Sequence, residues 1–384
     1  MKPMSPFSVT LAAAILLAGA SQVQAAQWRN EPFFKSSVKY DDNVRFVADQ
    51  KEDSAGVVLD LGVSMINESE SVETAIQPRL SFRGYASQSD LNTTDAYLDL
   101  ITRMRGLRSN LGFVVGFAHD SAISSELQDT GRVTINARRN RVSISPSWEY
   151  RLSPRNSIEL GYNYQNVQWS DNENAGLLDN NINEVFGQFK RRLNEHDDMT
   201  LKLSQSDFES PDSGFQSTTI GASAGFVRRF SEVNSIELEA GGWNTDLSAG
   251  TGSETKSGGS FGATLVHQEE VYTYRLGLGQ SVVPSSAGQV RQDRRLTGYL
   301  DYRTSPRLHW GVDALFIQAG RIGDVTTEQD RDYFAVRPFM AWDWTRKLSL
   351  SASVRFSGQT FKSTDTSSDR TELLMTLAYG KQGI

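Results

Sequence analysis

The chain has 384 residues, a formal net charge of −7 and a mean hydropathy of −0.43. The mild acidity and the lack of a basic stripe or tail argue against a nucleic-acid partner. The sequence contains no cysteine, which excludes disulfides and a lipid-carrying cysteine behind a signal peptide. A low mean hydropathy does not exclude a membrane barrel, because the polar lumen face of each strand dilutes the apolar lipid face.

The N-terminus has the pattern of a secretory signal peptide. Lys2 precedes an apolar run over 9–20, and Val23-Gln24-Ala25 supplies the small residues of a cleavage site. We therefore predict a signal peptide over 1–25 and a single domain over 26–384. No later stretch is long and apolar enough for a membrane helix, so the mature chain is expected to leave the cytoplasm without a helical anchor.

The rest of the chain alternates apolar and polar residues with a period of two, which is typical of β-strands that have one apolar face. The stretch LSLSASVRFS over 348–357 is the clearest case. Related turn phrases, such as YRLSPRNSIEL and RRFSEVNSIEL, return at roughly 40-residue intervals. Short turns are predicted over 67–71, 106–109, 153–156, 194–198, 231–234, 268–271, 305–307 and 345–347.

Longer connections rich in Asp, Asn, Gly, Ser and Thr alternate with these short turns. They are predicted over 41–54, 87–94, 121–131, 170–180, 209–214, 248–258, 285–290, 323–330 and 363–369. The two sets predict an all-β, antiparallel up-and-down transmembrane barrel of about 18 strands, with 16 as the other possible count. The strands between them would have roughly 10–14 residues, enough to cross a bilayer at a tilt.

The aromatic residues favour a membrane barrel over a soluble fold. A β-propeller would need four short strands in each repeat, whereas each repeat here supplies two long ones. Many long strands with an apolar outer face also need a closed sheet, because closure removes the free edges. Aromatic side chains gather beside the short turns, where an interfacial girdle is expected; they are Trp148, Tyr150, Tyr272, Tyr274, Tyr302, Trp310, Trp342, Trp344 and Tyr379.

The polar face of the strands carries charged residues that are expected to line a water-filled lumen. The functional interpretation is a pore wall with a basic bias that favours an anionic, hydroxyl-rich solute. The alternative is an ordinary solvated wall whose charges pair across strands. The lumen-lining candidates are Arg79, Arg83, Arg103, Arg141, Arg151, Glu159, Glu237, Arg275, Arg295, Asp301, Arg303, Asp313, Arg337 and Arg355.

Patterns for catalysis or cofactor binding are poor, so no enzyme activity, metal or cofactor is expected. The four histidines lack ligand spacing. The stretch GTGSETKS over 250–257 has Thr255 where a phosphate loop needs glycine before its lysine. The stretch DNENAG over 171–176 lacks the later acids of a calcium loop.

The start of the mature chain, FFKSSVKYDDNVRF over 33–46, together with the RLSPRNS-type turns, resembles a family of outer-membrane β-barrel porins whose genes are often found in exopolysaccharide operons. Tyr40-Asp41-Asp42-Asn43 is the sharpest element of the resemblance. The resemblance implies an integral barrel in the outer membrane of a Gram-negative bacterium, surrounded by lipid and lipopolysaccharide. It also implies export of a secreted polysaccharide with periplasmic export or co-polymerase proteins as partners.

Three functions therefore stay open. The first is an exit channel for an exopolysaccharide, and the second is a diffusion or substrate-selective porin for small solutes. The third is a barrel enzyme or adhesin. Neighbouring genes for glycosyltransferases and a polymerase would favour the first over the second.

Overall fold

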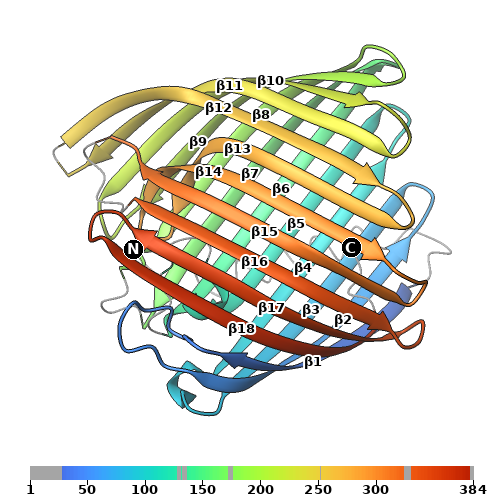
Figure 1. Cartoon of the computed structure of the whole chain (residues 1–384). Helices are drawn as coiled ribbons and strands as arrows, with labels where there is room; N and C mark the ends of the chain where they lie inside the picture. Colours follow the sequence, from blue (N-terminus) through green and yellow to red (C-terminus); the bar gives the residue numbers. More distant parts are fainter. Residues whose placement is uncertain are drawn as a thin grey trace.

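The computed structural model describes residues 28–127, 131, 136–171, 176–250, 252–323 and 330–380, so the predicted signal peptide lies outside the described residues. Each strand pairs in antiparallel fashion with its neighbours along the chain, and β1 also pairs with β18 (Figure 1). The sheet is therefore a closed barrel of 18 strands. This confirms the predicted up-and-down barrel and the larger of the two strand counts.

The strands are 13 to 17 residues long, so the predicted strand length was too short at its upper end. They are β1 (Trp28–Asp41), β2 (Ser54–Glu68), β3 (Val72–Tyr85), β4 (Thr93–Arg105), β5 (Ser109–Ser121), β6 (Arg138–Ser153), β7 (Asn156–Ser170), β8 (Asn180–Arg192), β9 (Asp197–Ser210), β10 (Phe215–Arg229), β11 (Asn234–Ala249), β12 (Gly252–Gln268), β13 (Tyr272–Ser285), β14 (Gln289–Arg303), β15 (Leu308–Arg321), β16 (Arg331–Asp343), β17 (Leu348–Phe361) and β18 (Thr366–Tyr379). Two short helical turns, η1 (Ser89–Leu91) and α2 (Ala122–Ser125), lie in connections. In the described part of the chain, neither helix has the length and apolarity to span a membrane.

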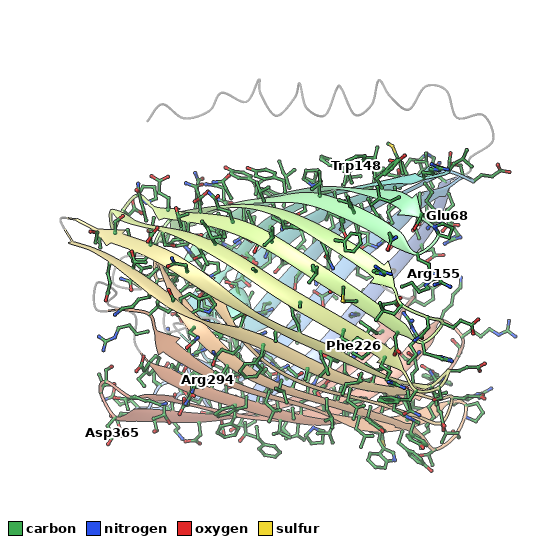
Figure 2. All side chains as sticks on the ribbon, turned by 90° about the horizontal axis from the view of Figure 1, so that it is seen from above. Glu68, Trp148, Arg155, Phe226, Arg294 and Asp365 are labelled. Carbon is green, nitrogen blue, oxygen red and sulfur yellow. The ribbon has the colours of Figure 1, made fainter. Side chains whose placement is uncertain are left out.

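The outer face of the barrel is apolar and the inner face is polar. On β18, Leu373, Met375 and Leu377 are exposed on the outside, whereas Glu372 and Thr376, from alternate positions, line an interior cavity. Figure 2 shows side chains projecting from the outside of the wall in that view. A continuous belt of this kind is stable only against lipid, because it would aggregate in water.

The connections divide the barrel into a turn end and a loop end. The eight predicted short turns all join strands at one end, which we call the turn end; β1 begins and β18 finishes there as well. The other end, called the loop end, carries the nine remaining connections. In outer-membrane barrels the short turns face the periplasm and the longer loops face the exterior.

Several connections predicted to be long are tight hairpins instead. The predicted loop over 248–258 is mostly strand, since β11 runs to Ala249 and β12 begins at Gly252. The predictions over 209–214, 285–290 and 363–369 were too long for the same reason. Beyond the membrane both faces of a hairpin meet water, so polar residues continue the backbone ladder without an apolar face.

At the loop end, connections fold into the barrel. The β5–β6 connection brings Ala122 and Ile123 of α2 inside, and the β1–β2 connection brings in Val44 and Phe46. Phe46 adopts a φ of 53° and packs against Tyr333 of β16. These residues form apolar clusters on the inner wall, so the mouth of the barrel is narrower than its backbone outline.

Candidate functional site

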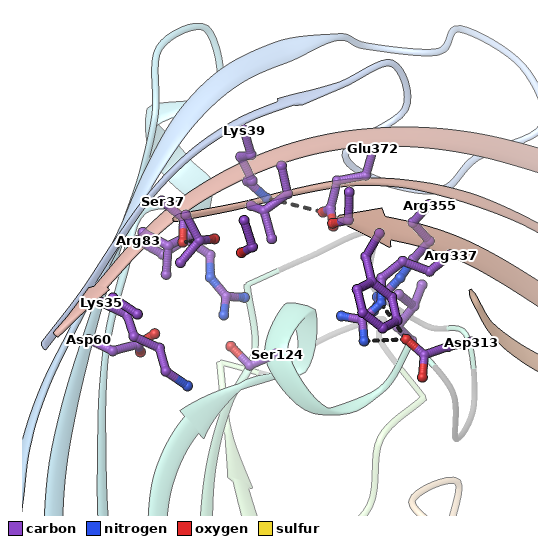
Figure 3. Close-up of a pocket in the computed structure, with 18 of the residues that line it drawn as sticks. Lys35, Ser37, Lys39, Asp60, Arg83, Ser124, Asp313, Arg337, Arg355 and Glu372 are labelled. Carbon is purple, nitrogen blue, oxygen red and sulfur yellow. Dashed lines mark hydrogen bonds and ion pairs between the residues drawn. The ribbon is translucent and has the colours of Figure 1, made fainter. Parts of the chain in front are cut away.

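A cavity of about 870 Å³ lies between α2 and the inner wall formed by β1–β3 and β15–β18 (Figure 3). Its charged lining has more cations than acids. The cations are Lys35, Lys39, Arg83, Arg337, Arg355 and Arg370, and the acids are Asp60, Asp313 and Glu372. The strand alternation places these side chains inside, because each occupies a position between two outward-facing residues.

Some of the cations are held by acids of the same strand or of neighbouring strands. Arg337 on β16 donates from Nε to Asp313 Oδ2 on β15 at 2.9 Å. Arg370 donates to Glu372 Oε2 at 3.2 Å and forms a bidentate pair with Asp41, which is fully buried. These pairs orient the wall and neutralise part of its charge.

Arg83 and Arg355 are different, because neither has an ion-pair partner among the described residues within 4.0 Å. The Nε atom of Arg83 is buried and has no hydrogen-bond partner in the structure. Figure 3 shows the two side chains entering the cavity from different walls, with Ser124 on the side of α2 that is nearer to Arg83. A buried donor without a partner is costly, so this pair of guanidinium groups is suited to an anion that enters the cavity.

The position of α2 is fixed from both sides. Ser124 Oγ donates to Asp95 Oδ2 at 2.7 Å, and Arg138 donates to Asp95 Oδ1 at 3.0 Å. After the helix, Glu126 is fully buried; it accepts a hydrogen bond from Ser286 Oγ at 3.0 Å and lies 3.8 Å from Arg139. Residues 122–126 of the β5–β6 connection therefore form a fixed wall of the cavity.

The structure brings only some of the predicted lumen-lining residues together. Four of them, Arg83, Asp313, Arg337 and Arg355, line this cavity, and Arg275 and Arg295 line a smaller one of about 390 Å³ beside it. The others lie elsewhere: Asp301 and Arg303 at a cavity near the β12–β13 turn, Arg151 at one near the β6–β7 turn, Arg79 over the ring of Tyr97, Arg103 beside Glu73, Glu159 beside Lys190, Arg141 on β6 and Glu237 on β11. Their role as a pore wall stays a prediction.

The sequence interpretation missed Lys35, Lys39, Arg370 and Glu372 as site residues, and it missed α2. The first two share one strand face with Ser37 in KSSVK and alternate with Ser36 and Val38, a signal that was available from the period-two pattern. The contribution of α2 had no such signal, because the residues around it resemble an ordinary polar connection.

The predicted aromatic residues lie near the turn end. Trp342 and Trp344 stack with ring centroids 5.9 Å apart, and Trp148 lies 5.8 Å from Tyr150. Tyr274 instead stacks on His267, with the ring centroids 4.9 Å apart. Exposed members are Trp148, Tyr272, Tyr302, Trp310, Trp342, Trp344 and Tyr379. Their role as an interfacial girdle stays a prediction.

No group of three or more histidine, aspartate or glutamate side chains that could hold a metal ion occurs within the described ranges.

Comparison with known proteins identifies the architecture. No protein-family model and no curated protein matches the sequence. The structure is similar to the outer membrane protein OpdK of Pseudomonas aeruginosa, with a TM-score of 0.51 and 11% identity over 92% of this chain and 99% of that chain. It is similar in the same way to OccAB1 of Acinetobacter baumannii, with a TM-score of 0.50 and 11% identity over 92% of this chain and 96% of that chain.

At this identity the likeness establishes the fold alone. The closed 18-stranded architecture, together with the lipid-facing belt, makes the protein an integral β-barrel of the porin type. Its location is the outer membrane of a Gram-negative bacterium. The comparisons support the barrel part of the family resemblance and give no support to its polysaccharide-export part.

Proposed function

We propose that the protein is a selective diffusion channel for small anionic solutes. The observation that carries this proposal is the position of Arg83 and Arg355, which face one cavity without an ion pair among the described residues. Guanidinium groups recognise carboxylates and phosphates through charge and paired N–H donors. A narrow aqueous path that is lined by an excess of positive charge raises the local concentration of anions.

The narrowed loop end favours small solutes over a polymer. The β5–β6 connection is anchored in the lumen through Asp95 and Glu126, and the tip of the β13–β14 hairpin is buried beside it. A secreted polysaccharide would need these segments to leave the path. The small-solute porin is therefore a better fit to the geometry than the exopolysaccharide exit.

The ion selectivity of the purified channel tests the proposal. In a planar bilayer with a KCl gradient, we expect the wild-type protein to prefer chloride. Arg83→Gln and Arg355→Gln should each lower the chloride-to-potassium permeability ratio roughly two- to fivefold, equivalent to about 0.5–1 kcal/mol of charge interaction in a hydrated cavity.

Arg294→Gln is the matched control, because Arg294 lies on the outer face and bonds to Gln280 and Gln318 (Figure 2). It removes the same charge without changing the cavity, so the permeability ratio should stay at the wild-type value. Equal ratios in all three variants and the wild type would overturn the proposal.

A further inference from the structure

The barrel wall is interrupted between β12 and β13. The ladder between these strands has eight residue pairs and ends at Phe261–Gln280, whereas the ladder between β11 and β12 has sixteen. Over the next residues of β12, 257–260, the described chain supplies no backbone partner on the side that faces β13. Half of one strand interface is therefore missing at the loop end.

The missing partner has turned into the barrel. We call residues 281–290, the loop-end part of β13, the connecting turn and the first residues of β14, the inner hairpin; residues 291–293 of β14 still pair with 319–321 of β15. Ser285 and Val290 within it are at most 3% exposed. Its turn is held by the β7–β8 connection, where Leu178 N donates to Ser286 O at 2.8 Å. In Figure 1, β14 accordingly runs close to β9 across the barrel.

An apolar cluster holds the inner hairpin against the inner face of β9–β11, on the other side of β12. Val290 of the hairpin belongs to one buried cluster with Phe208 of β9, Phe215 of β10 and Leu247 of β11, and Val282 packs against it. An added Cβ at Gly288, which has a φ of +77°, would lie 2.6 Å from Ser210 Oγ and 2.8 Å from a Leu178 methyl carbon. The inner hairpin is thus tightly packed against these residues.

The sequence explains why the ladder stops. Continued in the same register, Pro284 would lie opposite Ser257, and proline has no N–H to donate to a partner strand. On the β12 side, the carbonyl of Gly259 instead accepts hydrogen bonds from two side chains, Trp243 Nε1 at 3.2 Å and Gln280 Nε2 at 2.9 Å. Side chains therefore satisfy a backbone group that a strand would satisfy in an uninterrupted wall.

We propose that the inner hairpin is a gate with two positions. In the position seen here it lies across the loop-end mouth, packed on β9–β11. In the other position, residues 281–284 join the wall by pairing with residues 257–260 of β12, and the mouth widens. The inner position gains apolar burial, and the wall position gains backbone hydrogen bonds, so the two are able to compete. This proposal depends on the proposed channel function only for the identity of the solute that passes the gate.

A reversible cross-link tests the gate directly, because the chain has no native cysteine. Leu178→Cys combined with Ser286→Cys joins the two segments that share the 2.8 Å backbone hydrogen bond. In single-channel recordings in KCl we expect two conductance levels for the reduced protein. Oxidation should abolish the larger level, and reduction should restore it.

Leu178→Cys alone is the control and should respond to neither reagent. Identical recordings from the oxidised and reduced double variant, after the disulfide has been verified by mass, would overturn the gate. The readout is total conductance, so it is independent of the anion preference that tests the proposed function.

Pro284→Val is a second variant that acts in the opposite direction. It restores a backbone N–H at the position facing Ser257 and keeps an apolar side chain. We expect the time spent at the larger conductance to increase relative to the wild type. A decrease, or no change, would contradict the wall position as the open state.

Discussion

At the scale of single residues, Asp179 in the β7–β8 connection is a carboxylate whose charge is unfavourable to the fold. It accepts a hydrogen bond from Trp169 N at 2.7 Å, yet partial burial raises the pKa of the Asp179 carboxyl above its usual value, and the nearby charge of Asp212 acts in the same direction. Because the pKa of Asp179 is higher in the folded state than in the unfolded state, the carboxyl contributes to the stability of the fold only while it is protonated. This contribution to the free energy of unfolding is fully present below the unfolded pKa of 3.8 and is lost as pH rises through the folded pKa.

Asp179→Asn should therefore raise the unfolding temperature at pH 7 and leave it unchanged at pH 3. The amide oxygen keeps the acceptor for Trp169 N and carries no charge. The temperature at which the folded gel band is lost measures this effect. Asp212→Asn removes only the smaller cause, the charge of Asp212, so it should raise the unfolding temperature at pH 7 by less than Asp179→Asn does. A fall in unfolding temperature for Asp179→Asn would contradict the assignment.

Individual site residues were predictable from the strand alternation, but their partners were not. The alternation placed Arg83, Asp313, Arg337 and Arg355 on the polar face, and all four line the main cavity. It could not show that Arg83 and Arg355 form no ion pair within 4.0 Å in the described part of the chain, because the neighbours of each strand face depend on the register. Nor could it show that Ser124 would enter the lumen, since an inward-folded connection has no periodic pattern.

At the scale of strands and turns, the sequence predicted the eight short turns and the number of strands. It was wrong about strand ends at the loop end, for example at Ala249 and Gly252, where polar residues continue a hairpin beyond the membrane. The interruption between β12 and β13 was also not predicted. Pro284 marks it in the sequence, but this residue lies just before the connection predicted over 285–290 and was not singled out.

Strand β17 offers a test of the two faces. Leu350 is exposed on the lipid side, whereas Ser351 lines the interior cavity. Val354→Arg, on the same outer face as Leu350 but near the middle of β17, should impair insertion, since an arginine near the middle of the lipid belt costs about 2–4 kcal/mol. Ser351→Arg places the same charge in a wet cavity and should leave insertion unchanged. Outer-membrane yield and heat-modifiable gel mobility report the difference, and equal losses would mean that the faces are reversed.

At the scale of the whole molecule, the Tyr40-Asp41-Asp42-Asn43 motif closes the barrel. Asp41 of β1 forms the bidentate pair with Arg370 of β18, and Asp42 Oδ1 accepts a hydrogen bond from Thr371 N at 2.7 Å. Asn43 Nδ2 donates to Asp369 O at 2.8 Å. The sharpest motif of the sequence thus joins the first and last strands rather than contacting a solute.

Asp41→Asn should strongly destabilise the barrel, because it leaves the buried Arg370 guanidinium with a weakened partner; removal of one member of a buried ion pair costs about 3–5 kcal/mol. Denaturant unfolding in detergent measures the loss. Asp369→Asn breaks the exposed pair with Lys51 in the same region and should cost about 0–1 kcal/mol. A loss for Asp41→Asn as small as that of the control would exclude a closing role for the motif.

The pair between Asp41 and Arg370 spans 329 positions of the polypeptide. A truncated chain that lacks β18 has no Arg370, so Asp41 on β1 has lost this ion-pair partner. Such a fragment remains an open sheet with a free edge at β1. It would be accessible to periplasmic proteases and could not enclose a pore. Only a chain that has been made as far as β18 can form this pair, so the stabilisation that it gives to the closed barrel becomes available late in synthesis.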